Sequence, residues 1–390
     1  MTSPLLPDGQ TCLGVLGGGQ LGRMFVHAAQ TLGFRTVVLD PDADSPAGAA
    51  AHHHLRAPYL DADALAELAS RCAAVTTEFE NVPAAALQTL AASVPVAPAA
   101  AAVAICQDRF AEKRHFQRSE VPCAPFATIA ADADLAAPGL DALLPGILKT
   151  TRLGYDGKGQ VAVPSRQALA DAWATLGRAP CVLEKRLALQ RELSVIVARG
   201  ADGALVHLPV QQNLHRDGIL AVTQVPAPDV PKATARDAVT LAGRLAASMD
   251  YVGVLCVEFF LVDDGSLVAN EMAPRPHNSG HYSVDACDLS QFDLQVRTLA
   301  RLPLPAPRQH SAAVMLNLLG DLWQAGPGAP PRTPDWAAVL ALPGVHLHLY
   351  GKTQPRPGRK MGHLTVTAAD PARARAVALQ AAACLGLPAF

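Results

Sequence analysis

The sequence predicts an α/β protein of more than one domain, in which a small parallel sheet is followed by a mixed α+β region. The chain has 390 residues, enough for two or three domains of ordinary size. Its first hundred residues alternate short apolar runs with helical patterns, which is typical of a parallel α/β domain. From residue 147 onward the expected strands are longer, and hairpins with glycine-rich turns appear.

The chain opens with a β-α-β pattern. An apolar run over residues 12–16 ends at Gly17-Gly18-Gly19, a helical pattern continues to Leu32, and a second apolar run over 36–39 ends at Asp40. Two further buried strands are expected over 75–79 and 94–97. We therefore expect an N-terminal domain over residues 1–107.

The rest of the chain divides at a charged helix and at a proline-bearing linker. Residues 108–119 form an amphipathic helix that we interpret as a hinge into a second domain over 108–306. A third domain is expected over 307–390, with strands at 314–318 and 345–350, a basic stretch at 352–360 and an alanine-rich terminal helix. Residues 326–334 are rich in glycine and proline and are expected to be a surface loop.

Composition argues against several classes of protein. The formal net charge is -2 with acids and bases mixed, which disfavours a nucleic-acid binder. No apolar run approaches the roughly 20 residues of a membrane helix and no signal peptide is visible, so we expect a cytoplasmic protein without a membrane partner. The eight cysteines are scattered without a C-x-x-C pair, which suggests neither a zinc site nor a disulfide framework. Three adjacent histidines, 52–54, lie in what we interpret as a solvated loop, and adjacent side chains cannot all face one ion.

The first glycine motif allows two interpretations. Gly17, Gly19 and Gly22 fit G-x-G-x-x-G after a strand, and Asp40 lies near the place of a ribose-binding acid. An NAD-dependent oxidoreductase would use both features. A tight turn whose amides face another ligand would explain the glycines equally well.

A second glycine-rich loop favours polyphosphate binding. Lys149 ends an expected strand, and residues 154–160 (GYDGKGQ) then present three glycines and Lys158 before the next strand. Exposed amides with a cation can fold over phosphates. It is not a Walker A loop, because no helix follows. An ordinary hairpin is the alternative, which a second lysine at Lys149 makes less attractive.

A hairpin pairs two carboxylates. Residues 254–262 and 267–272 are expected strands, and a two-residue turn at Asp264-Gly265 pairs residues whose numbers sum to 529, so Glu258 faces Glu271. Opposed carboxylates repel each other, and a divalent cation such as Mg²⁺ removes the repulsion. Asn270 adjoins them, although strand alternation points it to the other face. A shifted register is the alternative.

Five stretches together resemble one family. They are 17–24 (GGGQLGRM), 77–83 (TEFENVP), 154–160, 270–281 (NEMAPRPHNSGH) and 356–360 (RPGRK). The chain resembles the N5-carboxyaminoimidazole ribonucleotide synthetases from about Gly14 to His363. The resemblance implies an ATP-grasp fold with an N-terminal Rossmann-like domain, a small C-terminal domain and ATP clamped between two lobes of the middle domain. It also implies a homodimer.

The resemblance also implies site residues. The ATP phosphates would contact Arg109, Lys149 and the loop Gly154, Tyr155, Asp156, Gly157, Lys158, Gly159 and Gln160. The adenine would lie against Glu184, Lys185, Arg186 and Leu187, the ribose on Glu192, and His215, Asn270 and Glu271 would be further ATP contacts. Glu258 and Glu271 would hold Mg²⁺, and the first glycine turn would face the acceptor nucleotide with Gln20, Leu21 and Glu78, leaving Asp40 a structural role. Leu153 replaces a glycine that the family usually has, which would stiffen the loop.

The implied reaction uses ATP to carboxylate aminoimidazole ribonucleotide with bicarbonate, through carboxyphosphate or the CO₂ that it releases. Asp156 and His277 are candidates for proton handling, and Arg275 suits the bicarbonate oxygens unless it pairs with a metal-binding acid. Lys352, Arg359 and Lys360 are expected to bind the acceptor's 5′-phosphate; a solvated basic turn is the alternative. The formate-dependent glycinamide ribonucleotide transformylases are the nearest rival family, and a non-catalytic nucleotide-binding regulator is a rival of another class.

Overall fold

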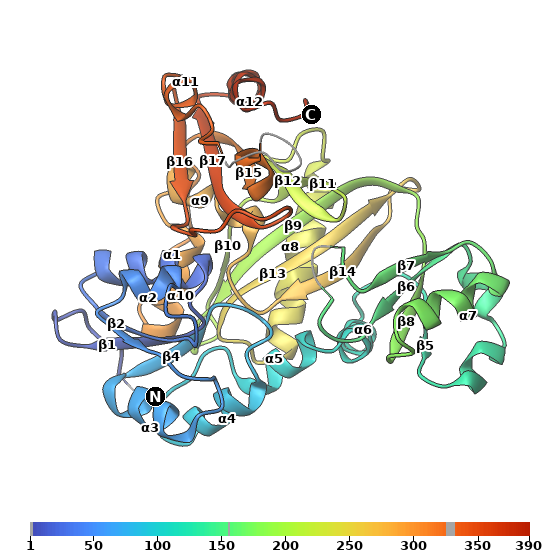
Figure 1. The fold of residues 1–390 in the computed structure, drawn as a ribbon, viewed down its shortest axis with the longest axis horizontal. Coiled ribbons are helices and arrows are strands. Elements are labelled where there is room, and N and C mark those ends of the chain that lie inside the picture. Colours follow the sequence, from blue (N-terminus) through green and yellow to red (C-terminus); the bar gives the residue numbers. More distant parts are fainter. Residues whose placement is uncertain (1–2, 155–156, 325–331) are drawn as a thin grey trace.

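The N-terminal region is a parallel sheet covered by helices. The computed structural model describes residues 3–154, 157–324 and 332–390. The strands lie in the order β3-β2-β1-β4, all parallel, and Figure 1 shows them at the lower left. The elements are β1 (Cys12–Leu16), α1 (Gln20–Thr31), β2 (Arg35–Leu39), α2 (Pro46–Ala50), β3 (His53–Leu55), α3 (Ala62–Arg71), β4 (Ala74–Thr77), α4 (Ala84–Ala91) and α5 (Ala100–Cys106).

Two expectations for this region were wrong. Residues 94–97 form no strand and make only one parallel bridge, between Val75 and Val96. Pro95 and Pro98 lack the amide donors that a ladder needs. The histidine run is not a loop either: His53 begins the edge strand β3.

A nine-stranded sheet forms the centre of the molecule. Its order is β14-β13-β9-β11-β12-β15-β17-β16, with β10 paired to β9. The strands are β9 (Leu189–Arg199), β10 (Leu205–His207), β11 (Gln211–Arg216), β12 (Ile219–Val225), β13 (Gly253–Val262), β14 (Leu267–Ala273), β15 (Ala312–Leu319), β16 (Val345–Leu349) and β17 (Lys360–Ala368). Strand β12 precedes the expected boundary at 306/307 and β15 follows it. Because these two strands pair, one continuous sheet spans both sides of that boundary. Residues 326–331 of the expected surface loop lie outside the described residues.

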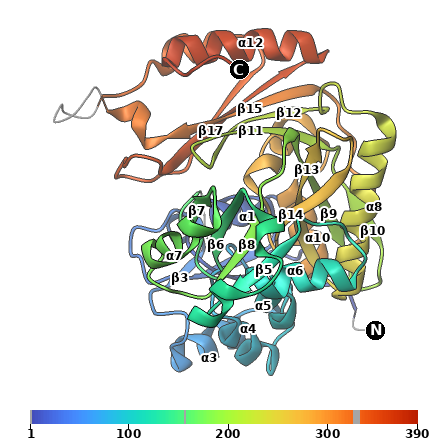
Figure 2. The same cartoon turned by 90° about the vertical axis from the view of Figure 1, so that its right-hand side faces the viewer.

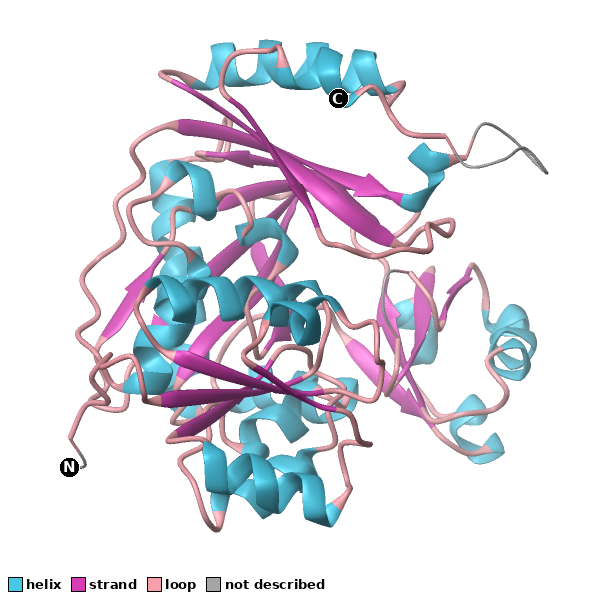
Figure 3. Ribbon diagram, turned by 60° about the vertical axis from the view of Figure 1, so that its left-hand side comes forward, coloured by secondary structure: helices cyan, strands magenta, loops and turns pink. Residues whose placement is uncertain are grey.

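Helices cover this sheet on both faces. Helix α8 (Lys232–Ser248) buries Leu245 against Val195 and Val257 of β9 and β13. Helix α10 (Gln291–Ala300) packs Phe292 against Phe25 of α1, and so joins the N-terminal region to the central sheet. The terminal helix α12 (Pro371–Leu385) lies over β15 and β17, as Figures 2 and 3 show.

A second, four-stranded sheet stands apart at the right of Figure 1. Its order is β5-β8-β6-β7, all antiparallel, and it packs on α7 (Arg166–Thr175). The strands are β5 (Phe126–Ile129), β6 (Gly146–Thr150), β7 (Gln160–Val163) and β8 (Cys181–Lys185). Helix α6 (Arg109–Arg118), capped by Asp108, precedes this sheet and contacts β14 and β8. Its bounds confirm the expected charged helix.

The remaining elements are short: η1 (Asp132–Ala136), η2 (Leu140–Leu143), η3 (Asn278–Gly280), α9 (Ser283–Ala286), η4 (Gly320–Trp323) and α11 (Trp336–Leu340). Among the helices formed by described residues, none has the length and apolar character needed to cross a bilayer.

Candidate active site

The main cavity lies between the two antiparallel sheets. It has a volume of about 880 Å³, and residues from Glu80 to Lys360 line it. The predicted site residues in its wall are Arg109, Lys149, Gly154, Gly157, Lys158, Gln160, Glu184, Lys185, Arg186, Leu187, Glu192, His215, Glu258, Asn270, Glu271, Arg275, His277 and Lys360. Six described residues of the prediction are not in that wall: Gln20, Leu21, Glu78, Gly159, Lys352 and Arg359. Tyr155 and Asp156 lie outside the described residues.

The two carboxylates of the β13–β14 hairpin are opposed, by a route that differs from the predicted one. The loop has three residues, since the amide of Val262 donates to the carbonyl of Ser266 and Leu261 pairs with Leu267. A regular ladder from that loop would place Asn270 opposite Glu258. A register shift between Glu258 and Phe259 makes Asn270 an extra residue, and Glu271 then pairs with Glu258. The predicted pair is confirmed, and the predicted two-residue turn is wrong.

This pair has the donor set of a hard cation. Burial, together with the charge of Glu271, raises the pKa of Glu258 to about 7. The side-chain oxygen of Asn270 is buried and has no hydrogen-bond partner among the described residues. The two carboxylates and this unpartnered amide oxygen are hard oxygen ligands that would suit Mg²⁺. Arg109 neutralises part of the charge from the other side, because its guanidinium lies 3.3 Å from the Glu271 carboxylate.

Helix α6 provides a buried lysine that sequence reasoning missed. Lys113 is fully buried, lies 3.1 Å from the Glu184 carboxylate and donates to the carbonyl of Asn270 at 2.9 Å. Lys149 lies 3.3 Å from the same carboxylate. Although burial opposes it, the charges of the two lysines lower the pKa of Glu184 to about 2.

A buried carboxyl group on the same helix was also missed. Glu112 accepts a hydrogen bond from the amide of Met272 at 2.7 Å, and burial raises its pKa to about 8. Arg109, Glu112 and Lys113 are spaced i, i+3 and i+4, so they share one helical face. That spacing was readable from the sequence and could have identified the face.

His215 and Glu192 form a second polar pair. They lie on adjacent strands, where Asn213 pairs with Glu192 and a register shift precedes His215. His215 Nδ1 hydrogen-bonds to the Glu192 carboxylate. Burial lowers the pKa of His215, but the hydrogen bond to Glu192 and the negative charges of Glu258, Glu192 and Glu271 together outweigh it, so the net shift is upward.

Arg275 forms an ion pair with Glu80 of the N-terminal region. Burial alone would favour the neutral form of each group. The positive charge of Arg275 nevertheless lowers the pKa of Glu80, and the negative charge of Glu80 raises the pKa of Arg275, so both stay ionised. The alternative that Arg275 pairs with a metal-binding acid is wrong, because its partner is outside the hairpin. The neighbouring Asn278 is buried and in the cavity wall, and neither its amide nitrogen nor its oxygen has a partner among the described residues. Sequence reasoning did not single it out.

The first glycine turn is filled by carboxylates. Glu78 accepts hydrogen bonds from the amides of Gly19 and Gly22, both at 2.7 Å. A Cβ atom on Gly19 would lie 2.4 Å from Glu78 Oε1, so the glycines make room for this side chain. Asp40 accepts from the amide of Gly18 at 2.6 Å, which gives it the structural role that we expected.

The basic turn over residues 352–360 approaches helix α1, which follows the first glycine turn. A Cβ atom on Gly351 would lie 2.8 Å from the guanidinium of Arg23 on α1. Lys352 donates to the carbonyl of Lys360 at 2.9 Å, and Arg359 donates to the carbonyl of Gln354 at 2.8 Å. Of the three predicted phosphate ligands, only Lys360 is in the cavity wall.

A further histidine cluster lies between α9 and the C-terminal strands. His348 hydrogen-bonds to Asp285 at 2.8 Å, and Tyr350 hydrogen-bonds to His363 at 2.9 Å. The rings of His348 and His363 are stacked, with centroids 4.5 Å apart and planes inclined by 13°. Nitrogen lone pairs lie in the ring plane, so stacked rings direct them side by side rather than toward one ion. We assign no metal to this cluster.

Comparisons with known proteins cover nearly the whole chain. The ATP-grasp domain family matches residues 114–292, the ribonucleotide synthetase preATP-grasp domain matches 10–107, and the phosphoribosylaminoimidazole carboxylase C-terminal domain matches 313–377. The N5-carboxyaminoimidazole ribonucleotide synthase of Brucella melitensis is 44% identical over 368 residues, which is 94% of this chain and 98% of the relative. That of Pseudomonas aeruginosa is 41% identical, over 93% of this chain and 96% of the relative.

Solved structures agree in fold over the same length. An ADP complex of N5-carboxyaminoimidazole ribonucleotide synthetase has a TM-score of 0.89 at 36% identity and covers 98% of both chains. The Aspergillus clavatus N5-carboxyaminoimidazole synthase, in complex with ADP and 5-aminoimidazole ribonucleotide, has a TM-score of 0.88 at 33% identity and covers 97% of this chain and 99% of that chain. Because both structures match nearly the whole chain, the similarity in fold includes the elements on both sides of the cavity.

Proposed function

The chain belongs to the N5-carboxyaminoimidazole ribonucleotide synthase family of ATP-grasp ligases, and from that premise we propose how its cavity performs the reaction. It is an ATP-dependent enzyme of purine biosynthesis that carboxylates 5-aminoimidazole ribonucleotide to N5-carboxyaminoimidazole ribonucleotide. The assignments of individual residues below are our proposals.

The observation that supports the site most strongly is the opposed pair Glu258 and Glu271 beside the unpartnered oxygen of Asn270. We propose that these three side chains hold Mg²⁺, which would neutralise charge on the ATP phosphates. Arg109 and Lys149, with Lys158 of the glycine loop, would supply the remaining positive charge around those phosphates.

The rest of the nucleotide would extend along β8 and β9. Residues Glu184 to Leu187 follow one another along the cavity wall and would contact the adenine, and Glu192 would accept hydrogen bonds from the ribose hydroxyls. His215, whose raised pKa reflects its bond to Glu192, would orient that carboxylate. This leaves the phosphate end of ATP directed toward Glu258 and Glu271.

Bicarbonate would bind between the cation site and Arg275. The guanidinium of Arg275 and the free amide of Asn278 offer donors to its oxygens, and Lys360 adds a positive charge in the same wall. A bicarbonate oxygen would attack the γ-phosphorus of ATP and expel ADP to give carboxyphosphate. The exocyclic amine of the acceptor would then form a bond to the carboxyl carbon, directly or after CO₂ is released, while phosphate leaves and the amine loses a proton.

This chemistry depends mainly on positioning and charge neutralisation, because every bond is made or broken on the substrates. His277 and Asp156, which lies outside the described residues, are the proposed groups for proton handling. The acceptor nucleotide would lie between the first glycine turn and the C-terminal basic turn. Its 5′-phosphate would be neutralised by Lys352, Arg359 and Lys360, with Arg23 of α1 close to Gly351. Gln20, Leu21 and Glu78 would lie on the opposite side.

Two further properties are proposed from family membership. A homodimer is expected, and sedimentation equilibrium of the full chain would test it. A cytoplasmic location is expected because the nucleotide substrates of purine synthesis are made there.

The function is tested by the acceptor that releases phosphate. With ATP, Mg²⁺ and bicarbonate, phosphate release should require 5-aminoimidazole ribonucleotide. Turnover with glycinamide ribonucleotide and formate instead would move the chain to the transformylase family. A parallel titration with NAD should give no binding, because Glu78 and Asp40 already occupy the amides of the glycine turn.

A further inference from the structure

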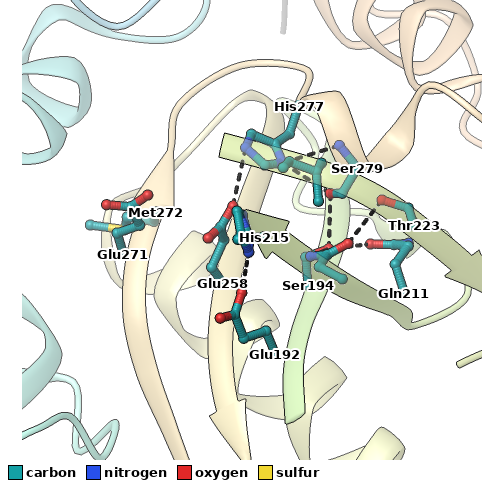
Figure 4. Close-up of polar contacts among 12 residues, drawn as sticks. Glu192, Ser194, Gln211, His215, Thr223, Glu258, Glu271, Met272, His277 and Ser279 are labelled. Carbon is teal, nitrogen blue, oxygen red and sulfur yellow. Dashed lines mark hydrogen bonds and ion pairs between the residues drawn. The ribbon is translucent and has the colours of Figure 1, made fainter. Parts of the chain in front are cut away.

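The strands of the central sheet bring a row of polar side chains to the metal hairpin. Ser194 of β9 pairs with Glu258 on one side and with Gln211 of β11 on the other. Directly paired residues in an antiparallel sheet share a face. The row therefore continues from the proposed metal-binding carboxylates into the core of the sheet (Figure 4).

His277 connects this row to Glu258. Its Nε2 lies 3.1 Å from Glu258 Oε1, and its Nδ1 lies 2.9 Å from the hydroxyl of Ser279. The backbone amide of Ser279 also points at Nδ1, at 3.3 Å. Figure 4 shows the imidazole between the carboxylate and the serine.

The directions of these hydrogen bonds follow from what each group can donate. A backbone N–H can only donate, so Nδ1 of His277 must offer its lone pair. An imidazole with a lone pair on Nδ1 has its proton on Nε2. His277 is then a donor to Glu258, and its Nδ1 is not available to bind a proton from a substrate.

The groups behind Ser279 are compatible with the same direction. Ser194 accepts from the amide nitrogen of Asn213 at 2.9 Å, so its one hydroxyl proton is available for Ser279 Oγ at 2.8 Å or Gln211 Oε1 at 3.0 Å. Asn213 is oriented in turn, because its side-chain oxygen accepts from the hydroxyl of Thr223 at 3.0 Å. Ser194, Ser279 and Thr223 are fully buried, so the chain of donors is shielded from solvent.

We propose that Ser279, supported by Ser194, is a positioning residue that keeps the proton of His277 on Nε2 and so holds Glu258 in place for the cation. The proposal rests on the role proposed above for Glu258, and it gives His277 the positioning of Glu258 in place of proton handling. One oxygen of Glu258 accepts from His277, which leaves the other free to face Glu271. Groups that orient metal ligands in this way typically change activity or metal affinity by about 10- to 100-fold when removed.

The test is made on the full chain, with Ser279→Ala compared with Ser283→Ala. Ser283 is also fully buried and lies four residues away, but its partners among the described residues are backbone groups, the carbonyl of Gly280 and the amide of Gln291. The Ser279 variant should lose about tenfold or more in kcat and in Mg²⁺ affinity, with the KM for ATP changed less than about twofold. The Ser283 control should show neither loss, even if both variants are less stable. Ser194→Ala should give a smaller loss of the same kind.

A spectroscopic measurement separates positioning from general destabilisation. In ¹⁵N-histidine-labelled protein, the resonances of His277 are identified by their absence in His277→Gln. Wild-type protein should show a protonated Nε2 and an unprotonated Nδ1. Ser279→Ala removes the hydroxyl at 2.9 Å and keeps only the backbone donor at 3.3 Å, so part of the population should shift toward the other tautomer. A protonated Nδ1 in the wild type, or an unchanged kcat and tautomer in Ser279→Ala, would overturn the proposal. If Glu258→Gln retained full activity, the proposed metal site would fail instead, and the tautomer result would stand by itself.

Discussion

At the scale of single residues, buried charges in the cavity are stabilised by opposite charges beside them. Glu184 is ionised because Lys113 and Lys149 surround it, and Arg275 is held by Glu80. Glu258 differs from these groups, since burial and the charge of Glu271 raise its pKa, and burial also raises the pKa of Glu112. The protein thus leaves one pair of carboxylates without protein cations sufficient to balance them, and a bound divalent cation would complete the site.

Replacing Glu271 tests that account. Glu271→Gln should reduce Mg²⁺-dependent ATP turnover by more than about a hundredfold. Removing a group that only orients a metal ligand typically lowers activity about 10- to 100-fold, and this substitution removes a ligand itself. The thermal midpoint of wild-type protein should rise with Mg²⁺ and an ATP analogue, and that of the variant should not. Asp264→Asn is the matched control, because it removes an exposed charge from the turn of the same hairpin. Near-normal turnover in a folded Glu271→Gln variant would refute the metal assignment.

The acceptor side gives a second prediction. Lys360→Ala should raise the KM for aminoimidazole ribonucleotide about 10- to 100-fold, since charge-assisted contacts are worth roughly 1.5–3 kcal/mol each. The KM for ATP should barely change. Arg356→Ala in the same exposed turn is the control, because its guanidinium bonds to Gln354 within the turn. A variant that lost ATP affinity and kept acceptor affinity would place the basic turn wrongly.

At the scale of elements, helix α6 joins the two lobes of the cavity. Lys113 contacts Asn270 of β14 and Glu184 of β8, so one side chain links the β13–β14 hairpin to the four-stranded sheet. The sequence indicated the helix and its charge, and the structure confirms its bounds. The sequence could not indicate which charges would be buried, because that depends on two strands more than 60 residues further along the chain.

Lys113→Met should therefore act on stability and on its pH dependence. Removing one partner of a buried ion pair costs about 3–5 kcal/mol in the free energy of unfolding. The pKa of Glu184 is lowered from 4.5 to about 2, so its contribution to stability is present above pH 4.5 and is lost as the pH falls toward 2. Wild-type protein should lose stability across that window, and the variant should lose less, because the pKa of Glu184 rises without Lys113.

Urea unfolding at several pH values between 2 and 7 would measure both effects. Lys232→Met, at an exposed position on α8, is the control for loss of a lysine charge. A variant as stable as wild type at pH 7 would show that Lys113 does not anchor the two lobes.

The β13–β14 hairpin shows how far sequence reasoning reaches. The opposed glutamates were predicted from a two-residue turn, and the structure reaches the same pair through a three-residue loop and a bulge at Asn270. Two errors of one residue cancel. The bulge also lifts the objection that strand alternation turns Asn270 away from the site. Alternating sequence patterns do not predict a bulge, because a bulge depends on the elements packed beside the hairpin. Here these are strand β9 and helix α6.

At the scale of the whole molecule, the central sheet connects the metal hairpin to the C-terminal strands without a break. The N-terminal region is fixed to it by α10 and by the ion pair between Arg275 and Glu80. The cavity wall consequently includes residues as distant in sequence as Glu80 and Lys360. The family resemblance assigned roles to about half of the residues in this wall. No role was assigned from the sequence to Lys113, Glu112 or Asn278. Lys113 and Glu112 are recognised by their burial, and Asn278 by its burial and its missing hydrogen-bond partners.

We propose that the cavity uses ATP to activate bicarbonate and transfers its carbon to aminoimidazole ribonucleotide. The most direct measurement supplies bicarbonate labelled with ¹³C and ¹⁸O, together with ATP, Mg²⁺ and the acceptor, and analyses both products by mass spectrometry. We predict ¹³C in the nucleotide product and an ¹⁸O atom in the released phosphate, because a bicarbonate oxygen bonds to the γ-phosphorus before phosphate leaves. Phosphate without ¹⁸O, or a nucleotide product without ¹³C, would contradict the account.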